Sequence, residues 1–383
     1  MAKLVEKLNR IKWKNYLNYV SIAIVAVIFS LMTFTTGLPQ STLFLLEKIT
    51  MNIILAVSLS LVVGFLGELS LGHAGFMCIG AYMGGKIACI FDKFTDGDGL
   101  LVLVISIAAG AVIAGAFGFV IGLPALRLKG DYLAIVTLAF GEIVKTVFEN
   151  TGKDSFGGPI GLRTPRFDKQ YLFIIGFVLV LITLAVMQNL IRSKHGRAIT
   201  AIRDNEIAAR ATGINVTKYK LVGFIISSAF AGVAGVFYSF ANSTVKASVF
   251  DYNYSIEILI MVVLGGMGNI NGAIISATLI TFINTKLQTV LTGDLAVLKD
   301  IIYALILVLI IIYNNAPALK TFRGKYNVRT LLSKLPRPKW AKQHYADDDD
   351  KWSRIPTKIS MDELLSTDLK VNESVVSPDK EEK

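Results

Sequence analysis

Long apolar segments alternate with short polar segments along most of the chain. Most apolar segments approach 20 residues, the length that lets a helix cross the hydrocarbon core of a membrane. Because lipid offers no hydrogen-bond partners, the backbone N–H and C=O groups of each segment must bond to one another, which they do in a helix. The pattern therefore predicts an all-α, polytopic integral membrane protein with about ten transmembrane helices, some of them broken or re-entrant. The expected segments are 16–37, 43–66, 74–91, 100–123, 132–149, 171–190, 219–241, the short 255–265, 273–291 and 299–313.

The amino-acid composition supports a membrane protein and argues against a nucleic-acid partner. The chain of 383 residues is 53% hydrophobic and 17% charged, whereas soluble domains carry about a quarter charged residues. The net charge of +11 comes largely from Lys and Arg beside the apolar segments. Contact with anionic membrane lipid explains this charge, so we expect no nucleic-acid partner.

The distribution of basic residues predicts the topology. An even number of crossings places both termini on the same side of the membrane. Most Lys and Arg residues outside the apolar segments fall on that side, and the side rich in Lys and Arg is usually cytoplasmic. We therefore expect a basic cytoplasmic N-terminus at 1–15, a transmembrane permease domain at 16–316 and a cytoplasmic tail at 317–383. The tail is polar, with few residues able to form a core, and is predicted to be largely disordered.

A polar island at 192–218 separates two long apolar segments and is the most distinctive part of the chain. Its basic residues outnumber its acidic residues, which predicts a cytoplasmic location. Residues 197–211 are predicted to form a short helix, with Gly213 as its stop. Two interpretations stay open: an element that docks on another protein, or a solvated amphipathic loop.

Three glycine-rich passages, 66–85, 110–132 and 264–277, interrupt the apolar pattern. Glycine and alanine let membrane helices pack closely, which is the structural interpretation. The functional alternative is a broken helix whose free backbone groups line a substrate path. The path candidates are Gly72, His73, Gly75, Gly265, Gly268, Asn269 and Asn271.

Few charges fall inside the apolar segments, and such residues usually face the bundle interior or water. Glu142 and Lys145 are three residues apart and are expected to form an ion pair on one helix face. The acidic residues do not line up as a proton relay, which argues against a proton-driven carrier. The charged positions are Glu47, Lys48, Lys86, Glu142, Lys145, Glu257 and Lys286.

Catalytic and cofactor motifs are not found in the sequence. It contains no phosphate-binding loop and no nucleophile with a matching base. The three histidines lack metal-ligand spacing, and Cys78 and Cys89 are expected to be buried thiols. We therefore predict no enzyme activity, no cofactor and no metal, and expect any driving energy to come from a partner.

Four sequences in order along the chain resemble the LivM-type permease family of bacterial branched-chain amino-acid ABC importers. They are LSLGHAGFMCIGAY (69–82), LPALRLKGDYLAIVTLAFGEI (123–143), GRAITAIRDNEIAARATGINVTKYK (196–220) and VVLGGMGNINGAI (262–274). The resemblance implies a plasma-membrane subunit that translocates leucine, isoleucine and valine. It also implies a sister permease in a heterodimer, two cytoplasmic ATPases and an extracytoplasmic substrate-binding protein.

The family's ATPase-coupling segment corresponds to residues 203–213. The resemblance implies coupling roles for Arg203, Glu206, Ala208, Ala209 and Gly213. The chain departs from the wider importer pattern because Ile207 separates the glutamate from the alanines. Two alternatives remain open: a urea or short-amide permease of the same architecture, and a stand-alone channel or secondary carrier.

Overall fold

A computed structural model describes residues 17–36, 39–93, 99–128, 130–165, 167 and 169–290, together with positions 304, 305 and 308. All of these lie in the first of two units, Met1–Asn314. The predicted N-terminal segment 1–15 and tail 317–383 lie outside the described residues, as does nearly all of the predicted segment 299–313.

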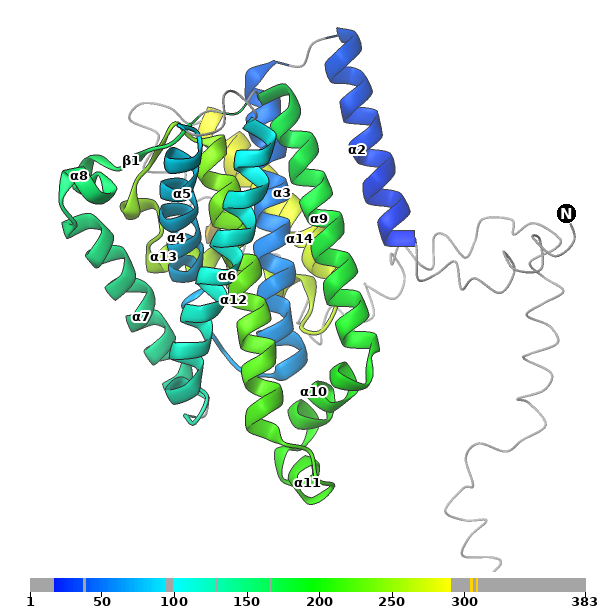
Figure 1. Cartoon of the computed structure of the whole chain (residues 1–383). Coiled ribbons are helices and arrows are strands. Elements are labelled where there is room, and N and C mark those ends of the chain that lie inside the picture. Colours follow the sequence, from blue (N-terminus) through cyan, green and yellow to red (C-terminus); the bar gives the residue numbers. More distant parts are fainter. Residues whose placement is uncertain are drawn as a thin grey trace, which may run out of the picture. The chain divides into compact units, whose positions relative to one another are not determined.

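The described chain is a bundle of membrane-type helices (Figure 1). Every predicted segment from 16–37 to 273–291 coincides with a helix. The elements that form these membrane-type helices are α2 (Leu17–Thr36), α3 (Gln40–Ser60) with the π-helix η2 (Leu61–Leu66), α4 (His73–Ile79), η3 (Gly80–Gly84), α5 (Gly85–Phe91), α6 (Gly99–Ala125), α7 (Asp131–Asn150), α9 (Lys169–Arg192), α12 (Val216–Ala241), α13 (Tyr252–Gly265) and α14 (Ile270–Val290). The connecting elements are α8 (Lys153–Phe156), η4 (Gly158–Ile160), β1 (Leu162–Arg163), α10 (Lys194–Asp204), α11 (Glu206–Ala211), β2 (Thr244–Val245) and η5 (Ala247–Val249).

Six helices in the described part are long and apolar enough to cross a membrane. They are Gln40–Leu66, His73–Phe91, Gly99–Ala125, Tyr171–Arg192, Val216–Ala241 and Ile270–Thr289. The all-α, multi-pass class is therefore confirmed, whereas the predicted count of about ten crossings is not.

The two ends of the bundle differ in structure. At one end, α10 and α11 connect α9 to α12 (Figure 1). At the other, β1 pairs antiparallel with β2, which joins the loop before α9 to the loop after α12. We refer to these ends as the α10–α11 side and the far side. The 24 residues of α9 separate them by about 36 Å at the helical rise of ~1.5 Å per residue.

Close packing of α6 on α12 explains the second glycine passage. The buried face of α6 is a stripe of small residues that includes Gly110, Ala114 and Gly118. A Cβ atom added to Gly118 would lie 1.9 Å from Ser228 Oγ on α12. The structural interpretation of this passage, close helix approach through small residues, is therefore confirmed.

The first glycine passage contains a true helix break. Residues 67–72 are neither helical nor extended in a sheet, yet Ser70 is buried at 2% exposure. Leu71 N donates to Thr137 Oγ1 of α7 at 3.0 Å. Neighbouring helices therefore supply partners for the irregular backbone, as membrane interiors require.

The short helix α13 begins inside the bundle. Tyr254 Oη donates to Asn52 Oδ1 in the middle of α3 at 2.8 Å, and Ser255 Oγ accepts from Ala74 N of α4 at 3.1 Å. From there its 14 residues extend toward the α10–α11 side. Segment 255–265, which the sequence pattern predicts to be short, is thus part of a 14-residue apolar helix rather than one of the six long spans.

Candidate functional site

The polar island forms two helices, so the prediction of one helix over 197–211 is wrong. Helix α10 ends at Asp204 and α11 begins at Glu206. Between them Asn205 has an extended backbone (φ −158°, ψ 105°), and its side-chain oxygen accepts from Ile207 N and Ala208 N, each at 3.0 Å. This asparagine cap ends one helix and begins the next.

The predicted glycine stop is confirmed. Gly213 has φ +85°, a left-handed conformation that residues with a Cβ rarely adopt. Gly213 N donates to Arg210 O, and Ile214 N donates to Ala209 O, both at 3.0 Å. These bonds cap the last carbonyls of α11 and turn the chain toward α12.

Arg203 connects the end of α10 to η2, the end of the membrane helix that begins as α3. Its Nη1 donates to Gly64 O in η2 at 3.1 Å, and its other guanidinium nitrogens donate to Asp204 Oδ1. Basic side chains commonly satisfy carbonyls at a helix C-terminus. Arg203 also lies 3.3 Å from where a Cβ on Gly268 would sit, so it is adjacent to the α13–α14 turn.

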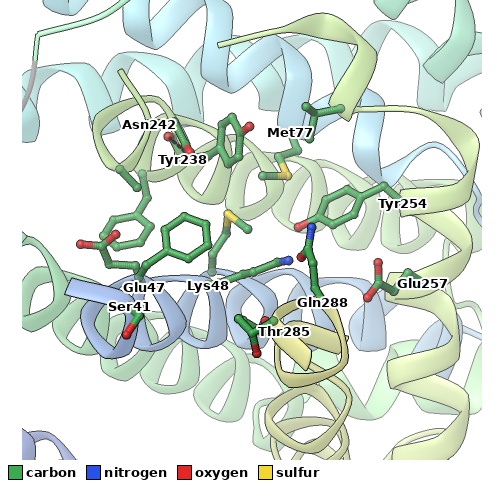
Figure 2. A pocket seen from close by; sticks show the side chains of 16 residues that line it. Ser41, Glu47, Lys48, Met77, Tyr238, Asn242, Tyr254, Glu257, Thr285 and Gln288 are labelled. Carbon is green, nitrogen blue, oxygen red and sulfur yellow. Dashed lines mark hydrogen bonds between the residues drawn. The ribbon is translucent and has the colours of Figure 1, made fainter. Parts of the chain in front are cut away.

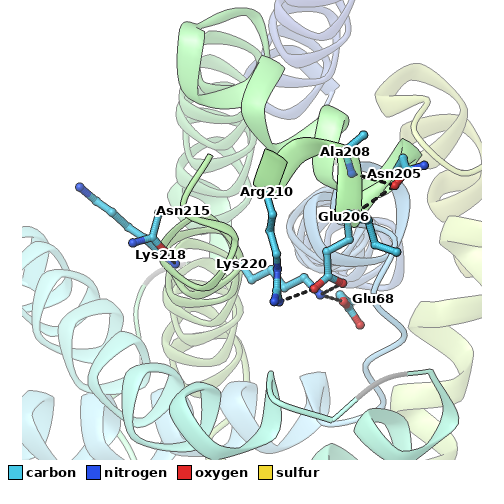
Figure 3. A network of polar contacts seen from close by, with 9 residues as sticks. Glu68, Asn205, Glu206, Ala208, Arg210, Asn215, Lys218 and Lys220 are labelled. Carbon is cyan, nitrogen blue, oxygen red and sulfur yellow. Dashed lines mark hydrogen bonds and ion pairs between the residues drawn. The ribbon is translucent and has the colours of Figure 1, made fainter. Parts of the chain in front are cut away.

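A buried lysine connects the polar island to the helix break (Figure 3). Lys220, at 4% exposure, pairs with Glu68 of the break and with Glu206 of α11, the latter at 3.2 Å. Glu206 also pairs with Arg210 at 2.6 Å. Glu206, for which the resemblance implies a coupling role, therefore makes contacts within this chain that connect α11 to segment 67–72.

The exposed tip of α11 differs from the expected contact face. Ala209 is buried, at 4% exposure, in a small cluster with Ile202 and Val216. Ile207, by contrast, is 81% exposed, and Ala208 beside it is also exposed. Ile207 is therefore the large apolar side chain that α11 exposes to a partner. Sequence reasoning treated this isoleucine only as an interruption of the importer pattern.

Two of the path candidates allow α4 to approach α7. A Cβ on Gly72 would lie 2.5 Å from Thr137 O, and one on Gly75 would lie 2.7 Å from Gly141 Cα. His73 between them is buried and its Nε2 lies 2.8 Å from Ser58 Oγ. These residues hold the start of α4 against its neighbours.

The other path candidates occupy the α13–α14 turn. A Cβ on Gly265 would lie 2.4 Å from the carbonyl carbon of Gly272, while Gly268 has φ +79° and packs on Gly64. Asn269 and Asn271 are exposed. The structure therefore separates the candidates into two groups, one beside Ser58 of α3 and one beside Gly64 of η2.

A cavity of about 460 Å³ lies among α3, α12, α13 and α14 (Figure 2). Its apolar lining includes Met51, Met77 and Phe237. Its polar lining includes Ser41, Glu47, Lys48, Tyr254, Glu257, Thr285 and Gln288. Sequence reasoning identified Glu47, Lys48 and Glu257 as charges within membrane segments but did not connect them, because they come from helices far apart in the chain.

Comparison with known proteins identifies the family. The family model described as "Branched-chain amino acid transport system / permease component" matches residues 41–311. The chain belongs to this family. The family is a transport permease class rather than an enzyme class, and with the six apolar helices it makes this chain a multi-pass protein of the bacterial plasma membrane.

Individual relatives agree with the family. The chain is 37% identical over 259 residues to the high-affinity branched-chain amino acid transport system permease protein LivM of Salmonella typhimurium, covering 60% of this chain and 59% of that protein. The chain is 34% identical over 298 residues to LivM of Escherichia coli, and the match covers 70% of this chain and 67% of that protein. The chain thus spans about three fifths to two thirds of these relatives. The ribose import permease protein RbsC of Escherichia coli is 28% identical over 295 residues, 71% of this chain and 84% of that protein. No solved structure matches significantly.

Proposed function

We propose that the chain is the membrane-spanning permease subunit of an ATP-driven importer of leucine, isoleucine and valine. The family and the similarity to LivM support this substrate class. In this proposal a sister permease completes the membrane part, two ATPases bind the cytoplasmic face, and an extracytoplasmic protein delivers the substrate.

The observation that carries the coupling role is the combination of an exposed tip with a buried anchor. Ile207 presents an apolar side chain on α11 beyond the membrane helices. Behind it, Arg203 holds Gly64 and Lys220 holds Glu68. A force applied at the tip would therefore reach the η2 end of the break between η2 and α4, through Gly64 and Glu68.

In this mechanism α10 and α11 act as a lever. An ATPase that grips Ile207 and Ala208 moves α11, and the Lys220 network carries the displacement to segment 67–72. That segment leads directly into α4, whose start packs on α7 through Gly75. Closure of the ATPases would thereby change the arrangement of the membrane helices.

The test is a pull-down combined with uptake. Ile207→Asp places a charge where an apolar contact is expected, and should weaken ATPase co-purification and ATP-dependent leucine uptake at least tenfold, because truncation at contact hot spots costs about 1–4 kcal/mol. Ile160→Asp is the matched control, since Ile160 is 58% exposed but lies on the far side. If Ile207→Asp keeps the ATPase and transports normally, the coupling role is refuted and α11 is a solvated loop.

Substrate class is tested by uptake into liposomes that contain the purified complex. The complex of this chain with its neighbouring gene products should take up leucine, valine and isoleucine in preference to urea and ribose. Preferential uptake of urea would support the short-amide alternative. ATP-independent uptake by the purified chain alone would support a channel or secondary carrier.

A further inference from the structure

Polar groups interrupt the apolar surface of the bundle where α7 meets α13. Glu142 Oε1 of α7 accepts from the backbone N–H of Tyr252, the first residue of α13, at 2.8 Å. Lys145, one turn away on α7, forms an ion pair with Glu142. Thr146 of α7 and Asn253 of α13 lie beside them and are exposed. We call these five residues the α7–α13 face.

This face lies at the depth of the membrane interior. Tyr252 is two residues before Tyr254, whose hydroxyl reaches Asn52 in the middle of α3. Glu142 is at least about 12 Å from either end of α7, at the helical rise of ~1.5 Å per residue. Charged side chains at this depth usually face protein or water rather than lipid, because hydrocarbon does not solvate them.

The described part of the chain leaves this ion pair partly open. The Glu142 side chain is 34% exposed and the Lys145 side chain is 20% exposed. Tyr252 beside them is 48% exposed. Partners inside the chain hold these groups in place, but hydrocarbon would still contact their exposed surface if lipid lay against this face. The α7–α13 face therefore requires a polar covering.

The outward faces of α6 and α9 differ from the α7–α13 face. Between their ends, neither helix contains a charged residue. Their exposed side chains include Val112 and Phe117 of α6 and Ile182 and Val186 of α9, which lipid can cover without cost. Figure 1 shows α7 at one margin of the bundle and α9 at the other. The surfaces of α6 and α9 thus suit lipid, whereas the margin at α7 suits another polypeptide.

We propose that the α7–α13 face is the surface on which the sister permease packs. The occupant is a membrane subunit that presents hydrogen-bond donors or a basic side chain toward Glu142, because an ionised carboxylate only accepts hydrogen bonds. This inference rests on the proposed function, which includes a sister permease. It also extends the lever. Gly141, next to Glu142, packs on Gly75 of α4, so a movement that reaches α4 would reach the subunit interface through α7.

Photo-crosslinking in the assembled complex tests this surface. The photoreactive residue p-benzoylphenylalanine in place of Tyr252 puts a reactive aromatic group on the α7–α13 face. The same residue in place of Phe117, which is 39% exposed on α6, is the matched control. Irradiation should join the Tyr252 site to the sister permease at least fivefold more efficiently than the Phe117 site, measured by mass spectrometry of the crosslinked bands. Equal yields, or adducts of the Tyr252 site only with lipid or with another part of this chain, would overturn the proposal.

Substitutions on the two kinds of surface provide the second test. Thr146→Trp adds bulk where the partner would pack and should lower co-purification of the sister permease at least tenfold. Val112→Trp adds the same bulk at a position 72% exposed on α6 and should leave co-purification within twofold. Glu142→Gln keeps an oxygen that can accept from Tyr252 N but removes the charge, and should lower co-purification at least threefold. Retention of the ATPase shows that a variant is folded. If Thr146→Trp and Glu142→Gln both keep the sister permease within twofold, the proposal is refuted.

The outcomes separate this inference from the proposed function. If the unmodified chain co-purifies with no second membrane subunit, the heterodimer in the proposed function fails. If a second membrane subunit co-purifies but crosslinks to the Phe117 site and not to the Tyr252 site, the importer stands and the α7–α13 face is not the interface.

Discussion

One buried lysine links the element that faces a partner with the element that shapes the membrane bundle. Lys220 lies at the start of α12 with Glu68 on one side and Glu206 on the other. Burying charges is costly, and the cost is offset only where each charge has partners. These ion pairs persist only while α11 and segment 67–72 keep their relative positions. A movement of α11 would therefore be transmitted to segment 67–72.

Removing this lysine should destabilise the chain. Lys220→Met leaves Glu68 and Glu206 partly buried without their shared cation, a change that costs about 3 kcal/mol in buried pairs. We expect a lower Tm in detergent, measured by thermal unfolding of the purified protein. Lys218→Met removes an exposed lysine and should leave the Tm nearly unchanged; equal Tm values for both variants would contradict the structural role of Lys220.

Glycine at the start of α4 is required by a backbone contact. A Cβ at position 75 would lie 2.7 Å from Gly141 Cα, where no side-chain movement can relieve the clash. Gly75→Leu should therefore sharply reduce the yield of folded protein in size-exclusion chromatography. Gly152→Leu is the control, because a Cβ there meets nothing within 4 Å. Normal yield of Gly75→Leu would mean that α4 and α7 do not pack as described.

At the scale of elements, a single side chain divides the polar island into two helices. Helical periodicity continues from Ala198 through Ala209, so the sequence pattern favoured one helix. Asn205 competes by accepting two backbone hydrogen bonds with its side chain, and burial of Ile202 and Ala209 on either side stabilises the bend. The short α11 is consequently held at an angle set by the cap and by Lys220.

Loss of this cap should weaken the coupling element without unfolding the bundle. Asn205→Ala removes two hydrogen bonds and should cost about 1 kcal/mol, which predicts a severalfold loss of ATPase in a pull-down. Asn205→Asp keeps the acceptor oxygen and should retain the ATPase. If Asn205→Ala and Asn205→Asp bind the ATPase equally, the cap does not set the geometry of the tip.

At the scale of the whole molecule, we expect cysteines on the two sides of the membrane to react differently with an impermeant thiol reagent. Positive charge at the α10–α11 side predicts that it is cytoplasmic. In a variant without Cys78 and Cys89, Arg210→Cys should resist an impermeant thiol reagent in intact cells and react after permeabilisation. Ile160→Cys on the far side should react in intact cells. The reverse pattern would invert the topology and refute the coupling proposal with it.

The sequence by itself determined the class of the protein, the positions of the described membrane helices and the family. These follow from local information. Runs of apolar residues specify membrane helices because backbone N–H and C=O groups in lipid must be hydrogen-bonded within the segment. The order of the motifs along the chain identifies the family. The glycine stop at Gly213 and the ion pair of Glu142 with Lys145, at 3.4 Å, were also predictable because each depends on residues close in the chain.

Only the tertiary structure decided which distant residues meet. Lys220 contacts Glu68 across 152 positions of sequence, and the cavity joins Lys48 of α3 to Glu257 of α13 and Gln288 of α14. Periodicity shows which face of a helix is polar, but not which helix faces it. That pairing is set by side-chain packing and the need to partner buried charge, so a coupling joint and a cavity become visible only once the helices are assembled.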